Sequence, residues 1–308
     1  MTKPLNYKWK LLGLSLLWLL IPDLNAQTVP IADAEELRRI RQIQQIPIAP
    51  NFLGPNALPV PEIGKGKVSS RSRLEAGWTG SFSEGDDTQS FITNLNYVVL
   101  ADRIAIHVQF VPVEFFNLTR DEQTRRNIED EFFESSGTQT GDVYYGFEVQ
   151  ILKEKKGWPD LMVRGSVKTA SGENVENGRF TDSPGYFFDA SLGKDIKLDE
   201  NRTIRPYGQL GFYSWQTYDV VLPQNDATMF GVGVDYDSEK YMFSSSLVGY
   251  AGWKDNGDDP VLWRIEGIKK LGKYDLKLGY QHGINDWQFR SITASLILNF
   301  DAAFNISS

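Results

Sequence analysis

The chain has 308 residues, with 32 Lys and Arg against 40 Asp and Glu, and a formal net charge of −8. This acidic balance argues against nucleic acid as a partner, because nucleic-acid binding requires a basic face. The sequence contains no cysteine, which excludes disulfide bonds and a lipid-modified cysteine in the leader. An apolar content of 41% fits either a soluble or a membrane protein, whereas 13% aromatic residues favour a membrane, where Tyr and Trp collect at the interfaces.

The first 26 residues have the features of an export signal. Lys3, Lys8 and Lys10 form a positively charged start, residues 11–21 form an apolar core, and Ala26 is the small residue before the expected cleavage site. This core is too short to cross about 30 Å of hydrocarbon as a helix, so a cleaved signal peptide is preferred to an uncleaved anchor. No other stretch approaches about 18 apolar residues, and the sequence therefore predicts no transmembrane helix.

Residues 27–72 differ in composition from the rest of the chain. Residues 32–45 are expected to form a short helix, because acidic residues come early and arginines come later, in accord with the helix dipole. Residues 46–63 contain five prolines, which favour an extended segment that pairs poorly with strands. The sequence thus predicts an N-terminal arm in front of the main fold.

Twelve segments between Leu74 and Phe300 alternate apolar and polar residues. In the last one, Ile292, Leu296 and Phe300 fall on one face and Thr293 on the other, as in a strand with one apolar and one polar surface. The twelve strands are expected at residues 73–83, 88–100, 104–115, 142–153, 160–170, 185–195, 204–216, 227–236, 240–251, 261–270, 273–282 and 287–300.

The connections between these strands alternate in length. Short or moderate connections fall at 101–103, 153–159, 196–203, 238–240 and 271–273, and most of the others are longer and more polar, at 116–141, 171–184, 217–226 and 252–260. In an up-and-down barrel every second connection lies on the same side of the membrane. The rhythm therefore predicts an all-β fold, an antiparallel up-and-down transmembrane β-barrel of about 12 strands, with both chain ends on the side of the short turns.

The two faces of the strands divide apolar from charged residues. Tyr274, Leu276, Leu278 and Tyr280 form a face with an apolar pair between two tyrosines, as expected for a strand that crosses lipid between two aromatic girdles. The opposite faces hold charges of both signs, which suits a narrow lumen with paired charges better than an ion-selective pore. The candidate lumen-facing residues are Glu75, His107, Glu148, Arg164, Lys168, Asp189, Arg205, Arg264, Glu266, Lys277 and Arg290.

The leader through Ala26, the alternating strands and the aromatic end of the last strand, Phe300, resemble the outer-membrane β-barrels of Gram-negative bacteria. The resemblance covers residues 1–26 and 73–300, and it implies a location in the cell outer membrane. It also implies contact with outer-membrane lipid and lipopolysaccharide, and insertion by the barrel-assembly machinery, for which Phe300 is the expected signal. Residues 301–308 are then a C-terminal tail, and residues 27–72 are a periplasmic or plug-like arm, with a loosely ordered periplasmic arm preferred.

The loops offer few groups for chemistry. Residues 117–142 are rich in acids, which suits a solvated loop or contact with divalent cations and lipopolysaccharide. Asp255, Asp258 and Asp259 are a weak metal candidate, because they lack the spacing and terminal glutamate of an EF-hand, and an ordinary polar loop is preferred. The sequence holds no phosphate-binding loop or dinucleotide fingerprint, so no cofactor is expected.

An enzyme is not expected either. Outer-membrane acyl hydrolases have a histidine with a serine two residues later, but Ile284 stands two residues after His282, and isoleucine is no nucleophile. The other histidine, His107, is expected to face the lumen, where Glu148 can orient it or a packed polar interior can hold both.

Three functions remain open. The first is a narrow channel for passive or facilitated passage of a small solute, because twelve strands lie between the eight that side chains fill and the sixteen that leave an aqueous pore. The second is a structural or surface-binding barrel that acts through its acidic external loops. The third and weakest is a lipid-modifying acyl hydrolase.

Overall fold

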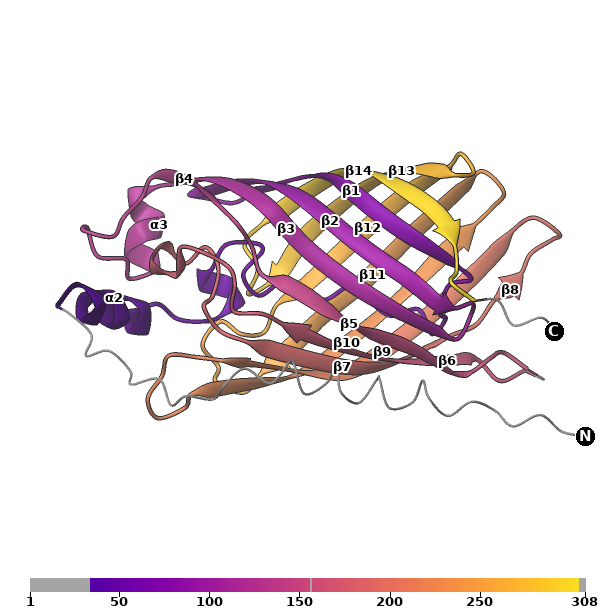
Figure 1. Ribbon diagram of the computed structural model, residues 1–308, viewed down its shortest axis with the longest axis horizontal. Helices are drawn as coiled ribbons and strands as arrows, with labels where there is room; N and C mark the ends of the chain where they lie inside the picture. Colours follow the sequence, from indigo (N-terminus) through magenta and orange to yellow (C-terminus); the bar gives the residue numbers. More distant parts are fainter. Residues whose placement is uncertain (1–33, 156, 305–308) are drawn as a thin grey trace, which may run out of the picture. The chain divides into compact units, whose positions relative to one another are not determined.

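The computed structural model describes residues 34–155 and 157–304, and the predicted signal peptide lies outside this range. Twelve long antiparallel strands form a closed barrel (Figure 1), as the sequence predicts. Their bounds are β1 Arg71–Phe82, β2 Asp86–Leu100, β3 Ile104–Leu118, β5 Val143–Leu152, β6 Asp160–Lys168, β7 Gly185–Gly193, β9 Thr203–Gln216, β10 Gln224–Asp237, β11 Tyr241–Gly252, β12 Val261–Lys270, β13 Tyr274–Asn285 and β14 Arg290–Asp301. Two short strands, β4 (Ser136–Gln139) and β8 (Ile196–Lys197), pair at the margins with β3 and β9.

The barrel closes because its first and last strands pair along their whole length. The register of β1 and β14 runs from Arg71 opposite Asp301 to Phe82 opposite Arg290. The pairing of β9 with β10 completes the ring. Closure leaves no barrel strand with a free edge, which satisfies the backbone hydrogen bonds of a strand surrounded by lipid.

The two ends of the barrel differ. We call the end with residues 101–103, 153–159, 194–202, 238–240 and 271–273 the turn end, and the end with residues 83–85, 119–142, 169–184, 217–223, 253–260 and 286–289 the loop end. The loop end carries helix α3 (Arg120–Arg125) and the 3₁₀ turn η3 (Val175–Asn177). Strand β1 begins and β14 ends at the turn end. Residues 301–304 fold back there, where the amides of Ala303 and Phe304 donate to the carbonyls of Val98 and Val99.

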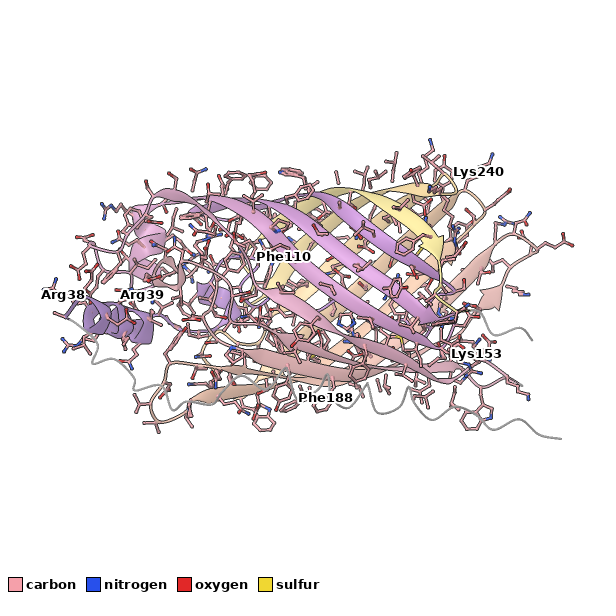
Figure 2. The ribbon with its side chains drawn as sticks, in the orientation of Figure 1. Arg38, Arg39, Phe110, Lys153, Phe188 and Lys240 are labelled. Atoms are coloured by element: carbon pink, nitrogen blue, oxygen red, sulfur yellow. The ribbon has the colours of Figure 1, made fainter. Side chains whose placement is uncertain are left out.

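Apolar side chains cover the outside of the barrel and polar side chains fill the inside. Leu278 is 66% exposed and Phe188 is 54% exposed, and Figure 2 shows Phe188 on the outer surface. Asp189, the next residue on β7, is 4% exposed and faces inward. This inverted distribution is that of a barrel built to face hydrocarbon. Within the described ranges, no helix is long and apolar enough to cross a membrane.

The N-terminal arm begins with helix α2 (Ala34–Gln45), followed by the 3₁₀ turn η2 (Pro50–Phe52). From residue 46 to residue 68 the arm lies inside the barrel. Near its start, the amide of Asn51 donates to the carbonyl of Gly257 at the loop end. Near its finish, the amide of Val68 donates to Gln150 on β5 at 2.7 Å, close to the turn end. The arm therefore passes through the lumen from loop end to turn end.

This path differs from two expectations. The arm was expected to be a loosely ordered periplasmic segment, but the residues that the structure describes follow the plug-like alternative. The chain ends were both expected on the side of the short turns, which holds for the start of β1 and the end of β14. Residues Gln42 and Gln45 of α2 instead contact Asn127 and Glu129 in a loop of the opposite end. The pattern of strands does not reveal the position of the arm, because an arm inside the lumen adds no strand to the barrel.

Candidate functional site

Arginines from the barrel wall bind the backbone of the arm. Arg264 on β12 donates to the carbonyls of Pro61 at 3.0 Å and Val60 at 2.6 Å. Arg164 on β6 donates to the carbonyl of Glu62 at 2.6 Å. The proline-rich arm has few amide hydrogens and does not pair with a strand, so its carbonyls need donors from side chains. The planar guanidinium suits this task, because it presents several donors in fixed directions.

The turn-end part of the arm is bound in the same way. Gln150 on β5 accepts from the amide of Val68 and donates to the carbonyl of Gly66 at 2.8 Å. Arg205 on β9 donates to the carbonyl of Lys65 at 3.0 Å, and the ammonium of Lys65 contacts Asp235 on β10 at 2.8 Å. The arm is thus fixed by wall side chains along its whole lumenal path.

The loop-end half of the arm also packs against apolar and aromatic side chains. Leu53 and Leu58 are each 1% exposed, in a buried cluster with Trp215 and Tyr250. The aromatic residues add polar contacts, since Tyr250 donates to the carbonyl of Leu58 at 3.0 Å and Trp215 to that of Ile48 at 3.2 Å. The arm is a packed part of the core rather than a loose filling.

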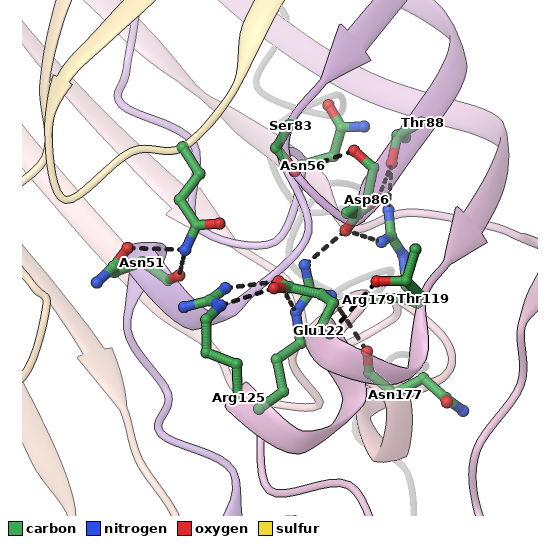
Figure 3. Close-up of polar contacts among 12 residues, drawn as sticks. Asn51, Asn56, Ser83, Asp86, Thr88, Thr119, Glu122, Arg125, Asn177 and Arg179 are labelled. Atoms are coloured by element: carbon green, nitrogen blue, oxygen red, sulfur yellow. Dashed lines mark hydrogen bonds and ion pairs between the residues drawn. The ribbon is translucent and has the colours of Figure 1, made fainter.

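A group of buried ion pairs lies at the loop end beside the arm, and Figure 3 shows Asp86, Glu122 and Arg179 of this group. It consists of Asp86, Glu114, Glu122, Arg126 and Arg179, and we call it the loop-end ion cluster. Arg126 contacts Asp86 at 2.5 Å and Glu122 at 2.8 Å, while Arg179 contacts Asp86 and, at 2.7 Å, Glu114. All five side chains are at most 3% exposed. Burial lowers the pKa of Arg179, but the two carboxylates outweigh it, so that its pKa lies above the ordinary value.

The cluster connects loops, wall and arm. Arg126 follows α3, Arg179 follows η3, and Asp86 and Glu114 lie on β2 and β3. The arm joins through Asn56, whose amide nitrogen donates to Glu114 at 2.6 Å and to Ser90 at 2.7 Å. Glu114 has Arg179 as its arginine partner, so loss of Arg179 leaves a buried carboxylate without a compensating charge.

Most candidate lumen residues lie on the inward side of their strands, in ion pairs with side chains of other strands or loops. Lys277 contacts Glu75 at 2.9 Å and Glu266 at 3.1 Å. Arg164 contacts Asp189 at 2.8 Å, Lys168 contacts Asp142 at 2.6 Å, and Arg205 contacts Asp160 at 2.9 Å. The positive and negative charges therefore neutralise one another within the wall.

His107 and Glu148 both point inward but do not form the pair considered from the sequence. The Nε2 of His107 lies 3.0 Å from the hydroxyl of Ser166 on β6, and Glu148 accepts from Asn96 at 3.1 Å. Gly146 on the intervening strand β5 permits the first contact, because a Cβ there would lie 2.8 Å from the His107 ring. The histidine thus reaches across a strand that presents no side chain.

The lumen position predicted for Arg290 is wrong. Arg290 is exposed and shares the outward side of β14 with Ile292. The alternate residues Ser291 and Thr293 face inward. Arg290 is the first residue of β14, at the loop end, where the outward stripe leaves the hydrocarbon and a charge costs little.

A cavity of about 170 Å³ remains in the lumen beside the arm. Its arm side consists of residues from Pro55 to Glu62. Its wall mixes polar with apolar and aromatic side chains and comes mainly from β1, β2, β3, β13 and β14, with contributions from β5, β6, β7 and β12. The polar wall residues on the five main strands include Thr79, Ser81, Asn94, His107, Gln109, Lys277, Gln281, Ser291 and Thr293.

The remaining candidates lie away from this cavity. The carboxylate of Asp258 is fully buried and accepts from Asn225 at 2.7 Å, which orders the loop between β11 and β12 that also holds Asp255 and Asp259. Across the described residues, no group of three or more potential ligands is placed to hold a metal ion. His282 and Ile284 lie on the outward side of β13 near the loop end, and Phe300 lies near Tyr97, with ring centroids 6.3 Å apart.

Several binding residues escaped the sequence reasoning. Gln150 follows the inward alternation of β5 and was detectable as a polar residue on the face of Glu148. Arg126, Arg179 and Asn56 lie in loops or in the arm, where no periodicity marks the direction of a side chain. Their roles follow only from the way the loops fold over the barrel.

No family model and no curated protein matches the sequence. Among solved structures, the COG4313 outer membrane channel from Pseudomonas putida F1 superposes with a TM-score of 0.54 at 11% identity, over 78% of this chain and 100% of that chain. The beta domain of the Bordetella autotransporter BrkA gives 0.43 at 12% identity, over 76% and 100%. The KdgM porin gives 0.42 at 6% identity, over 73% and 99%. At such identities the likeness concerns the fold alone: the chain has the architecture of an outer-membrane β-barrel.

Proposed function

We propose that this protein is a channel of the outer membrane for small solutes, restricted by its own N-terminal arm. The observation that supports this most directly is the cavity of about 170 Å³ left beside the arm inside the closed barrel, because passage of a solute requires space that side chains do not fill.

The arm sets the width of the path. It lies against β6, β7, β9, β10 and β11. A Cβ placed on Gly64 would be 2.9 Å from the Cβ of Ser191 on β7, and the side chain of Ile63 lies close to Gly231 on β10. The cavity lies on the opposite side, against β1, β2, β3, β13 and β14. Solute then passes beside the arm, and any loosening of the arm widens the path.

The membrane location and its partners belong to the same proposal. The outward apolar stripe of each strand suits contact with outer-membrane lipid, and the acidic loop end suits the side facing lipopolysaccharide. Recognition of Phe300 by the barrel-assembly machinery is part of this proposal too. The test is a spheroplast fractionation with detergent extraction, in which recovery in the soluble fraction would contradict the location.

Conductance across a planar bilayer tests the channel itself. The full chain is expected to give small discrete openings. A Gly64→Cys/Ser191→Cys pair can lock the arm to the wall, because the two Cβ positions are 2.9 Å apart and a disulfide needs about 3.5–4.5 Å, a shift of under about one ångström. The natural chain has no cysteine, so no other thiol interferes.

Oxidation of this pair is expected to reduce the openings, and reduction to restore them. Each single cysteine variant is the control and should respond neither to oxidation nor to reduction. Silence of the natural chain and of the reduced variant would contradict the channel. Equal openings in the oxidised and reduced protein would contradict the role of the arm.

The two other candidates have weaker support. A surface-binding barrel would act through acidic side chains that stay exposed at the loop end, such as Asp121, whereas Glu122 and Asp142 are engaged with Arg126 and Lys168 of the same chain. A hydrolase requires a nucleophile near His282, and the exposed side chain two residues later is Ile284. Release of fatty acid from lipid, lost in His282→Ala, would favour the hydrolase over the channel.

A further inference from the structure

A continuous patch of hydroxyl groups lines one wall of the lumenal cavity. On β1 and β14, Thr79 lies 2.9 Å from Thr293, and Ser81 lies 2.8 Å from Ser291, between side-chain oxygens. All four residues line the cavity. A hydroxyl carries one proton and two lone pairs, so a bonded pair of hydroxyls uses one proton and keeps the other for a third group.

Neighbouring strands add amides and one imidazole to this wall. Asn94 on β2 lies opposite Gln109 on β3, and His107 lies two residues from Gln109 on the same inward face. Gln281 contributes from β13. These side chains present both donors and acceptors, as a ligand with many hydroxyls requires.

Three polar atoms of cavity-lining residues are buried without a hydrogen-bond partner among the residues that the structure describes. They are the Oδ1 of Asn94, the Nδ1 of His107 and the Nε1 of Trp287. Trp287 is 6% exposed and lies between β13 and β14 at the loop end. Buried polar groups are nearly always paired in folded proteins, so these atoms indicate a ligand or water that supplies the missing partners.

The charged side chains around the cavity are already neutralised. Lys277 lies between two carboxylates, and Arg164 pairs with Asp189. Arg264 donates to two carbonyls of the arm and to Gln281 at 2.8 Å. A charged solute would lose its hydration here without a free counter-charge, whereas an uncharged solute would exchange water for hydroxyl and amide partners.

We infer that this cavity is a binding site for a small uncharged polyhydroxylated solute of about monosaccharide size. The cavity of about 170 Å³ leaves room for a small solute. The inference rests on the proposed channel function and names its solute class. Asn94 and His107 bind the solute on one part of the wall, and the ring of Trp287 contacts it nearer the loop end.

Ligand-observed NMR on the full chain in detergent tests this site. The probes are D-glucose and D-sorbitol, compared with gluconate, glucosamine and toluene as acidic, basic and apolar probes. Glucose and sorbitol are expected to show saturable signals, with at least tenfold weaker binding of the three others. Asn94→Leu and His107→Phe should each weaken glucose binding at least tenfold.

Thr79→Val and Thr93→Val form a matched pair, because Thr79 faces the cavity and Thr93 lies on the outward side of β2. Only Thr79→Val is expected to weaken binding. Folding of every variant is checked by the difference in gel mobility between unheated and heated samples. A loss of binding in Thr93→Val equal to that in Thr79→Val would overturn the assignment.

The result is separable from the channel test. If the protein conducts ions but none of the uncharged probes binds saturably, the solute class is wrong and the channel stands. If glucose binds and the Asn94 and His107 variants lose it, while every bilayer remains silent, the site stands and the channel is wrong. Tighter binding of gluconate or glucosamine than of glucose would also overturn the inference.

Discussion

Arg264 on β12 holds the carbonyl of Val60 at 2.6 Å, a contact between residues 204 positions apart in the chain. The second nitrogen of the same guanidinium holds the next carbonyl, that of Pro61. One wall residue thus fixes two consecutive peptide groups of the arm, in a segment where proline prevents strand pairing. The position of the arm, and with it the width of the lumen, depends on a few such side chains.

Replacement of this arginine should loosen the arm. Arg264→Ala removes both donors, and a hydrogen bond from a charged group contributes about 1.5–3 kcal/mol. Loss of one such bond alone corresponds to an increase of roughly tenfold to a hundredfold in the population of a displaced arm, and loss of both to a larger increase. More frequent or larger openings are expected in single-channel recordings. Arg290→Ala is the matched control, because Arg290 is an exposed arginine outside the lumen, and its conductance should equal that of the natural chain.

The loop-end ion cluster should contribute strongly to stability. Arg179→Ala leaves Glu114 buried and without its arginine, and breaking one side of a buried pair costs about 3–5 kcal/mol. The free energy of unfolding, measured with urea on the protein in lipid vesicles, should fall by that amount. Arg202→Ala is the control, because its pair with Asp199 is exposed to solvent and such pairs contribute little to stability. Equal shifts in the two variants would show that burial of the cluster is unimportant.

Gly146 should tolerate no side chain. A Cβ at this position would lie 1.9 Å from the carbonyl oxygen of Gly165 and 2.8 Å from the His107 ring. Since backbone cannot move aside cheaply, Gly146→Ala should cost more than about 3 kcal/mol, at the upper limit of overpacking effects. Gly279→Ala is the control, because its nearest neighbour, Thr293, would lie at an ordinary 3.5 Å. Folding yield, read from the heated and unheated gel mobilities, distinguishes the two.

The strands were predictable because their signal is local. Alternation alone located all twelve strands, and most bounds agree within two or three residues with the structure. Alternation does not predict which way a side chain points where the backbone is irregular. On β3, Phe110 pairs with Thr93 but Val113 pairs with Phe91, which places a bulge near Pro112. The bulge turns Glu114 inward. Alternation extended from Ile104 through Pro112 does not reveal that shift.

The site was less predictable because it is made by contacts between distant segments. The proline content of the arm indicated an extended chain, but an extended chain suits the periplasm and the lumen equally. The deciding contacts, such as those of Arg264 with Val60 and of Asn56 with Glu114, join the arm to the wall and leave no periodic trace. Charged residues on the inward faces were detectable, whereas the arginines of the loops were not.

Acidification should weaken the turn-end attachment of the arm. Asp195, in the turn between β7 and β9, contacts Arg205 at 2.6 Å and Lys67 of the arm at 3.2 Å. Burial raises the pKa of Asp195, but the hydrogen bonds and charges of Arg205 and Lys67 outweigh it, so that its pKa lies below the ordinary 3.8. A carboxyl with a lowered pKa stabilises the folded state above its unfolded pKa, and this stabilisation is lost as the pH falls through the folded value.

Channel openings are expected to become more frequent as the pH falls below about 4, because Asp195 then becomes neutral and releases Lys67. Asp195→Asn should already open more often at neutral pH and should lack that part of the response. Asp199→Asn is the control, since Asp199 lies in the same turn but pairs with the exposed Arg202 and does not contact the arm. An unchanged acid response in Asp195→Asn would show that the arm is held at the turn end by its backbone contacts with Gln150 and Arg205 alone.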